Sequence, residues 1–160
     1  MTVLQGPLVD RDTWSAVGRC PIEKTMALLG TRSAMLLMRE AYYGTTRFDD
    51  FARRVGITKA ATSARLTELV DAGLLTKRPY REPGQRARDE YVLTDAGTEL
   101  MPVVWAMFEW GRKHLADTPL RLTHLGCGAP ATVEVVCAQG HSVPPEELGV
   151  SLRRPTPGSS

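Results

Sequence analysis

Residues 56–75 constrain the fold more than any other segment, because they combine two dissimilar helix faces with a sharp end. Thr58 is a residue type that caps helix N-termini, and small or hydrogen-bonding side chains follow it. Leu66 and Leu69 then recur at helical spacing, and Gly73 ends the pattern. The segment therefore predicts a helix that packs through one face and leaves the other face free.

The sequence on either side suggests a use for the free face. A short helix is predicted over residues 47–55, where Phe48, Phe51 and Val55 share one face, and Gly56-Ile57 form a tight turn into the next helix. Two helices joined by a short turn that contains Gly are typical of a helix-turn-helix, whose second helix enters the DNA major groove. An ordinary amphipathic surface helix is the alternative.

A change of periodicity after Gly73 predicts a β-hairpin. The runs LLTKRPY and RDEYVL read as two strands, and the polar, basic run REPGQRA separates them. A helix-turn-helix followed at once by such a hairpin is a winged helix. The fold class predicted is thus mainly α with a small β-hairpin wing, that is α+β. A structural hairpin unrelated to DNA is the alternative.

The distribution of charge favours nucleic acid more than the net charge does. The 160-residue chain has a formal net charge of only +2, whereas DNA-binding domains tend to be distinctly basic. Residues 47–88, however, hold ten Lys and Arg against five Asp and Glu. Cations gathered there can neutralise phosphates and release counterions, although a solvated surface of mixed charge would look similar.

The candidate DNA contacts divide by side-chain chemistry. Thr62, Ser63 and Arg65 are predicted to approach base edges. Cations on the recognition helix and on the wing are predicted to contact phosphate or the minor groove. The complete predicted DNA-binding set is Arg47, Thr58, Lys59, Thr62, Ser63, Arg65, Arg81, Arg86 and Arg88.

Helices are predicted on both sides of the winged helix. Pro21 is suited to the first turn of a helix that Gly30 ends, and a second helix follows over residues 31–44. Thr94 caps a long helix that Pro102 should bend near its first turn. The wide apolar face of this helix, with two tryptophans, is more typical of an interface than of a cofactor site. Closure of the monomer core is the alternative.

These motifs together resemble the HxlR family of bacterial winged-helix transcription regulators, which are relatives of the MarR group. The resemblance covers residues 20–111, and its markers are Cys20-Pro21, the Leu-Leu-Gly of residues 28–30, Arg47-Phe48, the series Leu66, Leu69, Gly73 and Leu74, the wing end Tyr91-x-Leu93-Thr94-x-x-Gly97, and Trp110. It implies a homodimer on a palindromic double-stranded DNA operator, with half-sites about 34 to 36 Å apart. An unknown small-molecule effector is a further expected partner. A winged-helix module for protein contacts, without specific DNA binding, is the rival interpretation.

Other classes of protein find little support in the sequence. No Gly-rich phosphate loop, nucleophile elbow or H-E-x-x-H helix occurs, so no enzyme activity is predicted. No apolar run is long enough to cross a bilayer, and the N-terminus lacks the features of a signal peptide. Three cysteines are too few for a disulfide scaffold, which agrees with a reducing compartment. We therefore expect no membrane partner and a cytoplasmic, nucleoid-associated location.

Cys20 matches the position that some HxlR family members use as a redox or electrophile sensor. Such chemistry needs a thiolate with solvent access, and the start of the helix at Pro21 would favour the thiolate. A resolving cysteine is common in sensors, but the next cysteine is Cys127. Cys20 is therefore either a redox-sensing residue or a buried packing cysteine.

The chain is predicted to divide into four parts. Residues 1–19 form an N-terminal dimerisation arm, with an apolar helical edge around residues 12–17. Residues 20–117 form the winged helix-turn-helix domain with its C-terminal dimerisation helix. Residues 118–152 form a small β-rich extension that is strand-like over 132–136. Residues 153–160 have the composition of a disordered tail.

The extension carries a candidate metal site. His124, Cys127, Cys137 and His141 offer four nitrogen and sulfur donors in two close pairs, as in a structural zinc knuckle. The extension also resembles the zinc-ribbon-like extension of some actinobacterial family members, but Gly140 replaces the second Cys of one pair. Structural zinc, a metal-free ribbon and a Cys127–Cys137 disulfide are the three possibilities.

Overall fold

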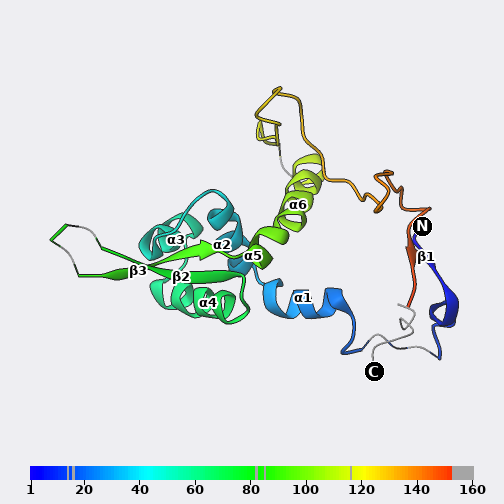
Figure 1. Ribbon diagram of the computed structural model, residues 1–160, viewed down its shortest axis with the longest axis horizontal. Helices are drawn as coiled ribbons and strands as arrows, with labels where there is room; N and C mark the ends of the chain where they lie inside the picture. Colours follow the sequence, from blue (N-terminus) through cyan, green and yellow to red (C-terminus); the bar gives the residue numbers. More distant parts are fainter. Residues whose placement is uncertain (14, 16, 82, 85, 116, 153–160) are drawn as a thin grey trace.

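The fold confirms the predicted class, which is mainly helical with a small β-hairpin wing (Figure 1). The computed structural model describes residues 1–13, 15, 17–81, 83–84, 86–115 and 117–152. Its elements are β1 (Val3–Leu4), η1 (Gly6–Val9), α1 (Pro21–Leu29), α2 (Arg32–Tyr42), α3 (Phe48–Val55), α4 (Lys59–Asp71), β2 (Leu75–Tyr80), β3 (Arg88–Leu93), α5 (Asp95–Glu99), α6 (Met101–His114) and β4 (Gly149–Val150).

The main core lies where α2, α3 and α4 pack against the β2–β3 hairpin. Its most completely buried members are large apolar side chains from each of these elements: Leu37, Met38, Phe51, Leu66, Leu69 and Leu75. β2 and β3 pair antiparallel from Leu75 opposite Leu93 to Tyr80 opposite Arg88. The amide of Tyr91 also donates to the carbonyl oxygen of Thr46 at 2.8 Å, so β3 is fastened to the segment before α3.

Local signals set the limits of α3 and α4, as the sequence predicts. The Thr58 side-chain oxygen accepts a hydrogen bond from the amide of Ala61 at 3.2 Å and so caps the start of α4. Gly56 ends α3 with φ +71°, and Gly73 follows α4 with the same φ. This left-handed conformation has a low cost only for glycine, so each helix stops where the chain must turn.

The helix predicted from Thr94 onward is divided rather than bent. α5 ends at Glu99 and α6 begins at Met101, with Leu100 as the cap residue between them, and Pro102 lies in the first turn of α6. Proline is tolerated there because its missing N–H would have no partner within the helix. α6 packs on α2 through Trp105, which stacks on Tyr43 with ring centroids 5.8 Å apart.

β1, close to the N-terminus, and β4, close to the end of the described residues, pair in parallel away from the wing (Figure 1). The helical edge predicted around residues 12–17 is wrong for the described residues, because Asp12, Thr13 and Val17 form turns and Ser15 is irregular; so short a segment cannot stabilise a helix. Trp14 and Ala16 lie outside the described residues. The role of the arm in dimerisation stays a prediction.

The extension contains less strand than predicted. Residues 131–135 have no strand, and isolated bridges join Thr123 to Pro130 and Val136 to Ser142. Alternating residues in this segment have no large core to pack against, so the predicted strand does not form. The predicted tail, residues 153–160, lies outside the described residues. Among the residues that the structure describes, no helix combines the length and apolarity needed to cross a membrane.

Candidate DNA interface

α4 presents its N-terminal half to solvent and holds the domain together through its opposite face. Leu66 and Leu69 are buried in the core. The exposed residues of the first two turns are small or polar: Lys59, Ala60, Ala61, Ser63 and Ala64. A backbone covered by small side chains can approach a groove closely, and Ser63 is exposed at the centre of this surface.

Thr62 does not belong to that surface, and its predicted base contact is corrected. Thr62 is 0% exposed, and its hydroxyl donates a hydrogen bond to the carbonyl oxygen of Thr58 at 2.9 Å. Thr62 precedes Leu66 by four positions, so the two side chains lie on the same stripe of the helix. The spacing that placed Leu66 in the core therefore also places Thr62 there.

The cations beside the exposed face of α4 are held in ion pairs. Lys59 Nζ lies 2.7 Å from Asp49 Oδ1 in the first turn of α3, and Arg65 pairs with Glu68. The hydrogen bond from Lys59 lowers the pKa of Asp49 below its ordinary value. Exposed pairs of this kind are weak in water, so a phosphate can replace the carboxylate. Both side chains remain available for a polyanion.

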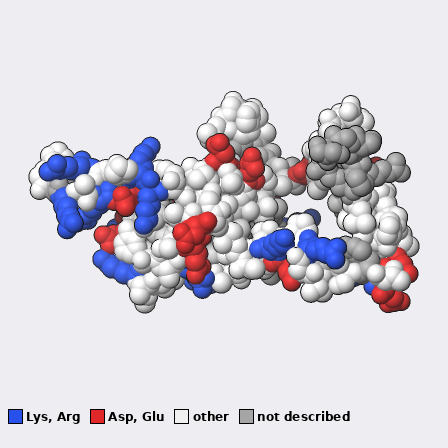
Figure 2. Space-filling model, turned by 60° about the horizontal axis from the view of Figure 1, so that its bottom comes forward, with Lys and Arg blue, Asp and Glu red and all other residues white. Residues whose placement is uncertain are grey.

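Several exposed cations gather on the wing. Figure 2 shows Lys and Arg side chains over the end of the molecule that bears the hairpin and the neighbouring helices. Arg81, Arg86 and Arg88 are exposed on the hairpin. The structure thus brings the predicted wing cations to one end, beside the exposed part of α4.

Arg47 differs from the other predicted contacts because its guanidinium lies against the outer half of the β2–β3 hairpin, where its Nη1 is buried without a hydrogen-bond partner among the described residues. Its Cζ lies 3.0 Å from the ring centroid of Tyr80, and its Nη1 lies 3.8 Å from Glu90 Oε2. The Nε of Arg78 donates to Glu90 Oε1 at 2.7 Å, which is the main cause of the lowered pKa of Glu90. The prediction from sequence missed Glu90 and Tyr80, since nothing local connects them to Arg47.

The candidate zinc ligands do not come together. His124 Nδ1 lies 3.1 Å from Cys127 Sγ, and Cys137 and His141 share a separate turn. Across the described residues, no group of three or more His, Cys, Asp or Glu side chains could hold a metal ion. The four residues as arranged therefore do not fit a tetrahedral zinc site, which corrects the prediction. Cys127 and Cys137 are both free thiols, so the disulfide alternative is not formed either.

Cys20 occupies the N-cap position of α1, as its neighbour Pro21 predicts. It is partly exposed and is a free thiol. Its side chain makes no capping hydrogen bond to the helix.

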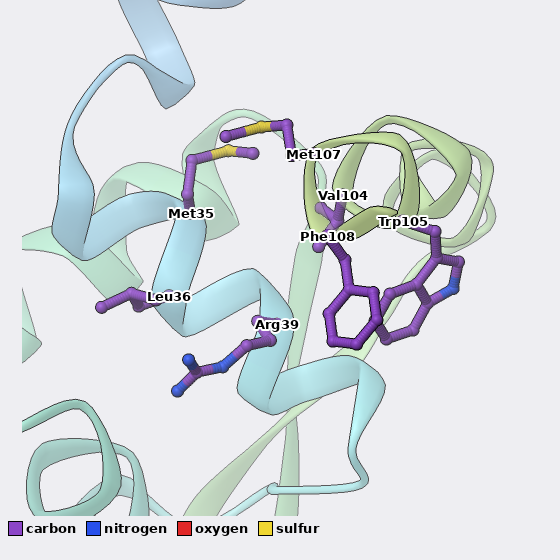
Figure 3. Close-up of a pocket in the computed structure, with 7 residues that line it drawn as sticks. All are labelled: Met35, Leu36, Arg39, Val104, Trp105, Met107 and Phe108. Carbon is purple, nitrogen blue, oxygen red and sulfur yellow. The ribbon is translucent and has the colours of Figure 1, made fainter. Parts of the chain in front are cut away.

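An apolar cavity of about 190 Å³ lies between α2 and α6. Figure 3 shows Trp105 and Phe108 side by side, Met35 and Met107 approaching each other, and the Arg39 side chain extending away from α6. Arg39 Nη2 is already paired with Glu40 Oε1 at 2.7 Å. A second cavity, of about 330 Å³, continues along α1 and shares Met35, Leu36 and Met107 with the first.

An exposed second helix of a helix-turn-helix beside an arginine-bearing hairpin defines the class of winged-helix DNA-binding proteins. The chain belongs to the HxlR-like helix-turn-helix family, whose sequence profile matches residues 28–119. The relatives in this family are HTH-type transcriptional regulators, and transcription regulation is therefore the class of function of this chain.

Two relatives and two solved structures illustrate the similarity. The HTH-type transcriptional regulator Mb3122 of Mycobacterium bovis is 33% identical over 140 residues, covering 86% of this chain and 85% of the relative. YdeP of Bacillus subtilis is 30% identical over 59% of this chain and 73% of its own length. The protein in the crystal structure of PA1607, a candidate transcription factor, is 29% identical in sequence to this chain. The match covers 85% of this chain and 96% of the PA1607 chain, with a TM-score of 0.74. The redox regulator HypR in its oxidized form is 31% identical. The match covers 61% of this chain and 99% of the HypR chain, with a TM-score of 0.55.

Proposed function

We propose that this protein binds a palindromic DNA operator as a homodimer and so regulates transcription, with one α4 helix in each half-site. The observation that carries the proposal is the exposed, small and polar N-terminal half of α4, with the basic wing beside it. The major groove admits an α-helix, and small side chains let its backbone approach the base edges. The wing arginines would supply contacts to phosphate and to the minor groove.

The surface of α6 supports the dimer. Val103, Met107 and Trp110 on this helix are 47%, 55% and 58% exposed. On α1, Ile22 and Met26 are also exposed. Apolar side chains gathered on neighbouring helices are unfavourable in water, and a second copy of the same surface would cover them symmetrically.

A binding titration across salt concentrations tests the DNA-binding part of this proposal. Fluorescence anisotropy with genomic fragments should reveal a preferred sequence and an affinity that falls steeply with salt, because phosphate contacts release counterions. Weak binding to every fragment, with little dependence on salt, would instead favour the module for protein contacts.

The two groups of proposed contacts should respond differently to substitution. Arg65→Ala should reduce the discrimination between the operator and mismatched sites, by about 1 to 3 kcal/mol at one base position. Arg86→Ala should weaken binding to all sequences nearly equally and lower the salt slope by about 1. Anisotropy with operator and scrambled duplexes measures both effects. The assignment is wrong if the two variants exchange these behaviours.

Thr62→Val should leave sequence preference unchanged, because Thr62 is buried beneath the exposed face of α4. The variant loses one hydrogen bond to Thr58, whose carbonyl oxygen still accepts from the Thr62 amide at 2.9 Å. The stability cost should therefore be about 1 kcal/mol or less. Chemical denaturation measures the cost, and a change in base preference would return Thr62 to the interface.

We further propose Cys20 as a thiol that modulates DNA binding. Its partial exposure at the N-cap of α1 and the similarity to the redox regulator HypR support this role. An oxidant should lower operator affinity at least tenfold in the wild type and leave Cys20→Ser unaffected, because only the wild type can oxidise at this position. If both proteins lose binding equally, Cys20 is a packing residue.

A small-molecule effector is proposed to occupy the cavity between α2 and α6. Its walls are almost entirely apolar side chains, including Trp105 and Phe108, which favours an aromatic or aliphatic compound over a polar one. Binding should change the intrinsic fluorescence, and Trp105→Phe should remove that change. A ligand whose signal survives Trp105→Phe binds elsewhere.

A further inference from the structure

Glu90 is a buried carboxylate in the outer half of the β2–β3 hairpin, where one arginine of β2 and one from the segment before α3 approach it. It is 8% exposed. Arg78, directly opposite Glu90 in the β2–β3 register, donates to it at 2.7 Å. Arg47, which immediately precedes α3, approaches its other oxygen to 3.8 Å. One side chain thus joins both strands of the hairpin to the start of the helix-turn-helix.

A second contact acts at the same place. The Arg47 guanidinium lies 3.0 Å from the ring centroid of Tyr80, the last residue of β2. Tyr80 pairs with Arg88, the first residue of β3, so this contact falls where the regular hairpin ends and its basic tip begins. We name the four side chains Arg47, Arg78, Tyr80 and Glu90 the wing clamp.

We propose that the wing clamp fixes the direction of the hairpin and so positions Arg81, Arg86 and Arg88 against the DNA backbone. This inference rests on the proposed DNA-binding function and adds positioning residues to it. A two-stranded hairpin by itself is marginally stable in water, so its direction depends on contacts with the body of the domain. A buried carboxylate that loses its partners is strongly unfavourable, so the clamp favours one geometry.

The role of Arg47 consequently differs from that of a phosphate contact. Its guanidinium is planar, which suits stacking on Tyr80, whereas a lysine ammonium cannot reproduce that contact. Arg47→Lys keeps the positive charge and therefore separates the two roles. A phosphate-contacting residue should tolerate the change with a loss of affinity below about threefold, whereas a clamp residue should not.

Glu90→Gln gives a test in which charge and positioning predict opposite results. The substitution removes a negative charge from the basic end of the molecule, which on electrostatic grounds should strengthen binding to DNA. If the clamp positions the wing, the variant should instead bind about tenfold more weakly, with a salt slope lower by about 2 because wing phosphate contacts are lost. Asp89→Asn is the matched control, because Asp89 is an exposed acid one position away. It should bind as well as the wild type or better.

A measurement without DNA completes the experiment. Trypsin should cleave the hairpin after Arg86 at least fivefold faster in Glu90→Gln and in Arg47→Lys than in the wild type or in Asp89→Asn. Circular dichroism and thermal melting establish whether each variant is folded. If Glu90→Gln does not fold, the binding and cleavage of Arg47→Lys test the proposal. The double variant Arg47→Lys/Glu90→Gln should bind DNA little more weakly, and be cleaved little faster, than either single variant. Each substitution already disrupts the same set of contacts, so their effects should not add.

The outcomes separate this inference from the proposed function. Tighter DNA binding by Glu90→Gln with unchanged cleavage would overturn the clamp. So would normal binding and normal cleavage in Arg47→Lys. If the wild type binds no DNA while the variants are cleaved faster, the proposed function fails, and the clamp stands only as a holder of the hairpin.

Discussion

Met107→Glu on α6 is expected to convert the dimer into monomers and to weaken operator binding at least about 100-fold. Met107 lines the two apolar cavities described above and also a third, on the exposed side of α6 beside Val103 and Trp110, so it lies at the centre of the surface that a second copy would cover. An unpaired carboxylate buried there costs several kcal/mol. A monomer also loses the gain from engaging two half-sites, which is on the order of 10² to 10⁴ in affinity.

Light scattering coupled to size-exclusion chromatography measures the mass, and anisotropy with full and half operators measures the affinity. Leu125→Glu is the matched control, because Leu125 is 98% exposed in the extension, outside α6. The control should remain dimeric and bind normally. A Met107→Glu protein that also stays dimeric and binds normally would show that this surface of α6 is not the interface.

Leu66→Ala is expected to destabilise the domain by about 2 to 5 kcal/mol, because it opens a cavity where α4 meets the core. Leu66 is fully buried. Ser63→Ala, on the exposed side of the same helix, should change stability by no more than about 0.5 kcal/mol. It should nevertheless weaken operator binding by about 1 kcal/mol, roughly fivefold, if its hydroxyl contacts DNA.

Chemical denaturation of both variants, with anisotropy of each at a temperature where it is folded, separates packing from recognition. Equal losses of stability would contradict the assignment of two faces to α4. Unchanged operator binding by Ser63→Ala would remove Ser63 from the proposed interface.

Much of the winged helix could be predicted from sequence, because short-range interactions set its limits. The cap at Thr58 and the left-handed glycines at 56 and 73 act within a few residues of the positions where they stand. The burial of Thr62 could also have been predicted, since it lies four residues before Leu66. An exposed hydroxyl would indicate DNA contact, but threonine can satisfy its hydroxyl within its own helix, as Thr62 does with the carbonyl oxygen of Thr58.

The extension shows where short-range patterns are insufficient. The spacing of His124 and Cys127 brings those two side chains together, and the turn from Cys137 to His141 also forms. A metal site, however, needs the two pairs to meet, and their relative position depends on the packing of a segment with little core. Spacing within each pair carries no information about that position.

The sequence by itself determined the order and limits of α3, α4 and the hairpin, because caps, turns and apolar spacing act between near neighbours. The tertiary structure alone decided what Arg47 does. Its partner Glu90 is 43 positions away along the chain, and the two meet only when β3 is fastened to the segment before α3. An arginine that the sequence predicts as a DNA contact therefore lies against the hairpin, because folding brings a buried carboxylate and an aromatic ring to it.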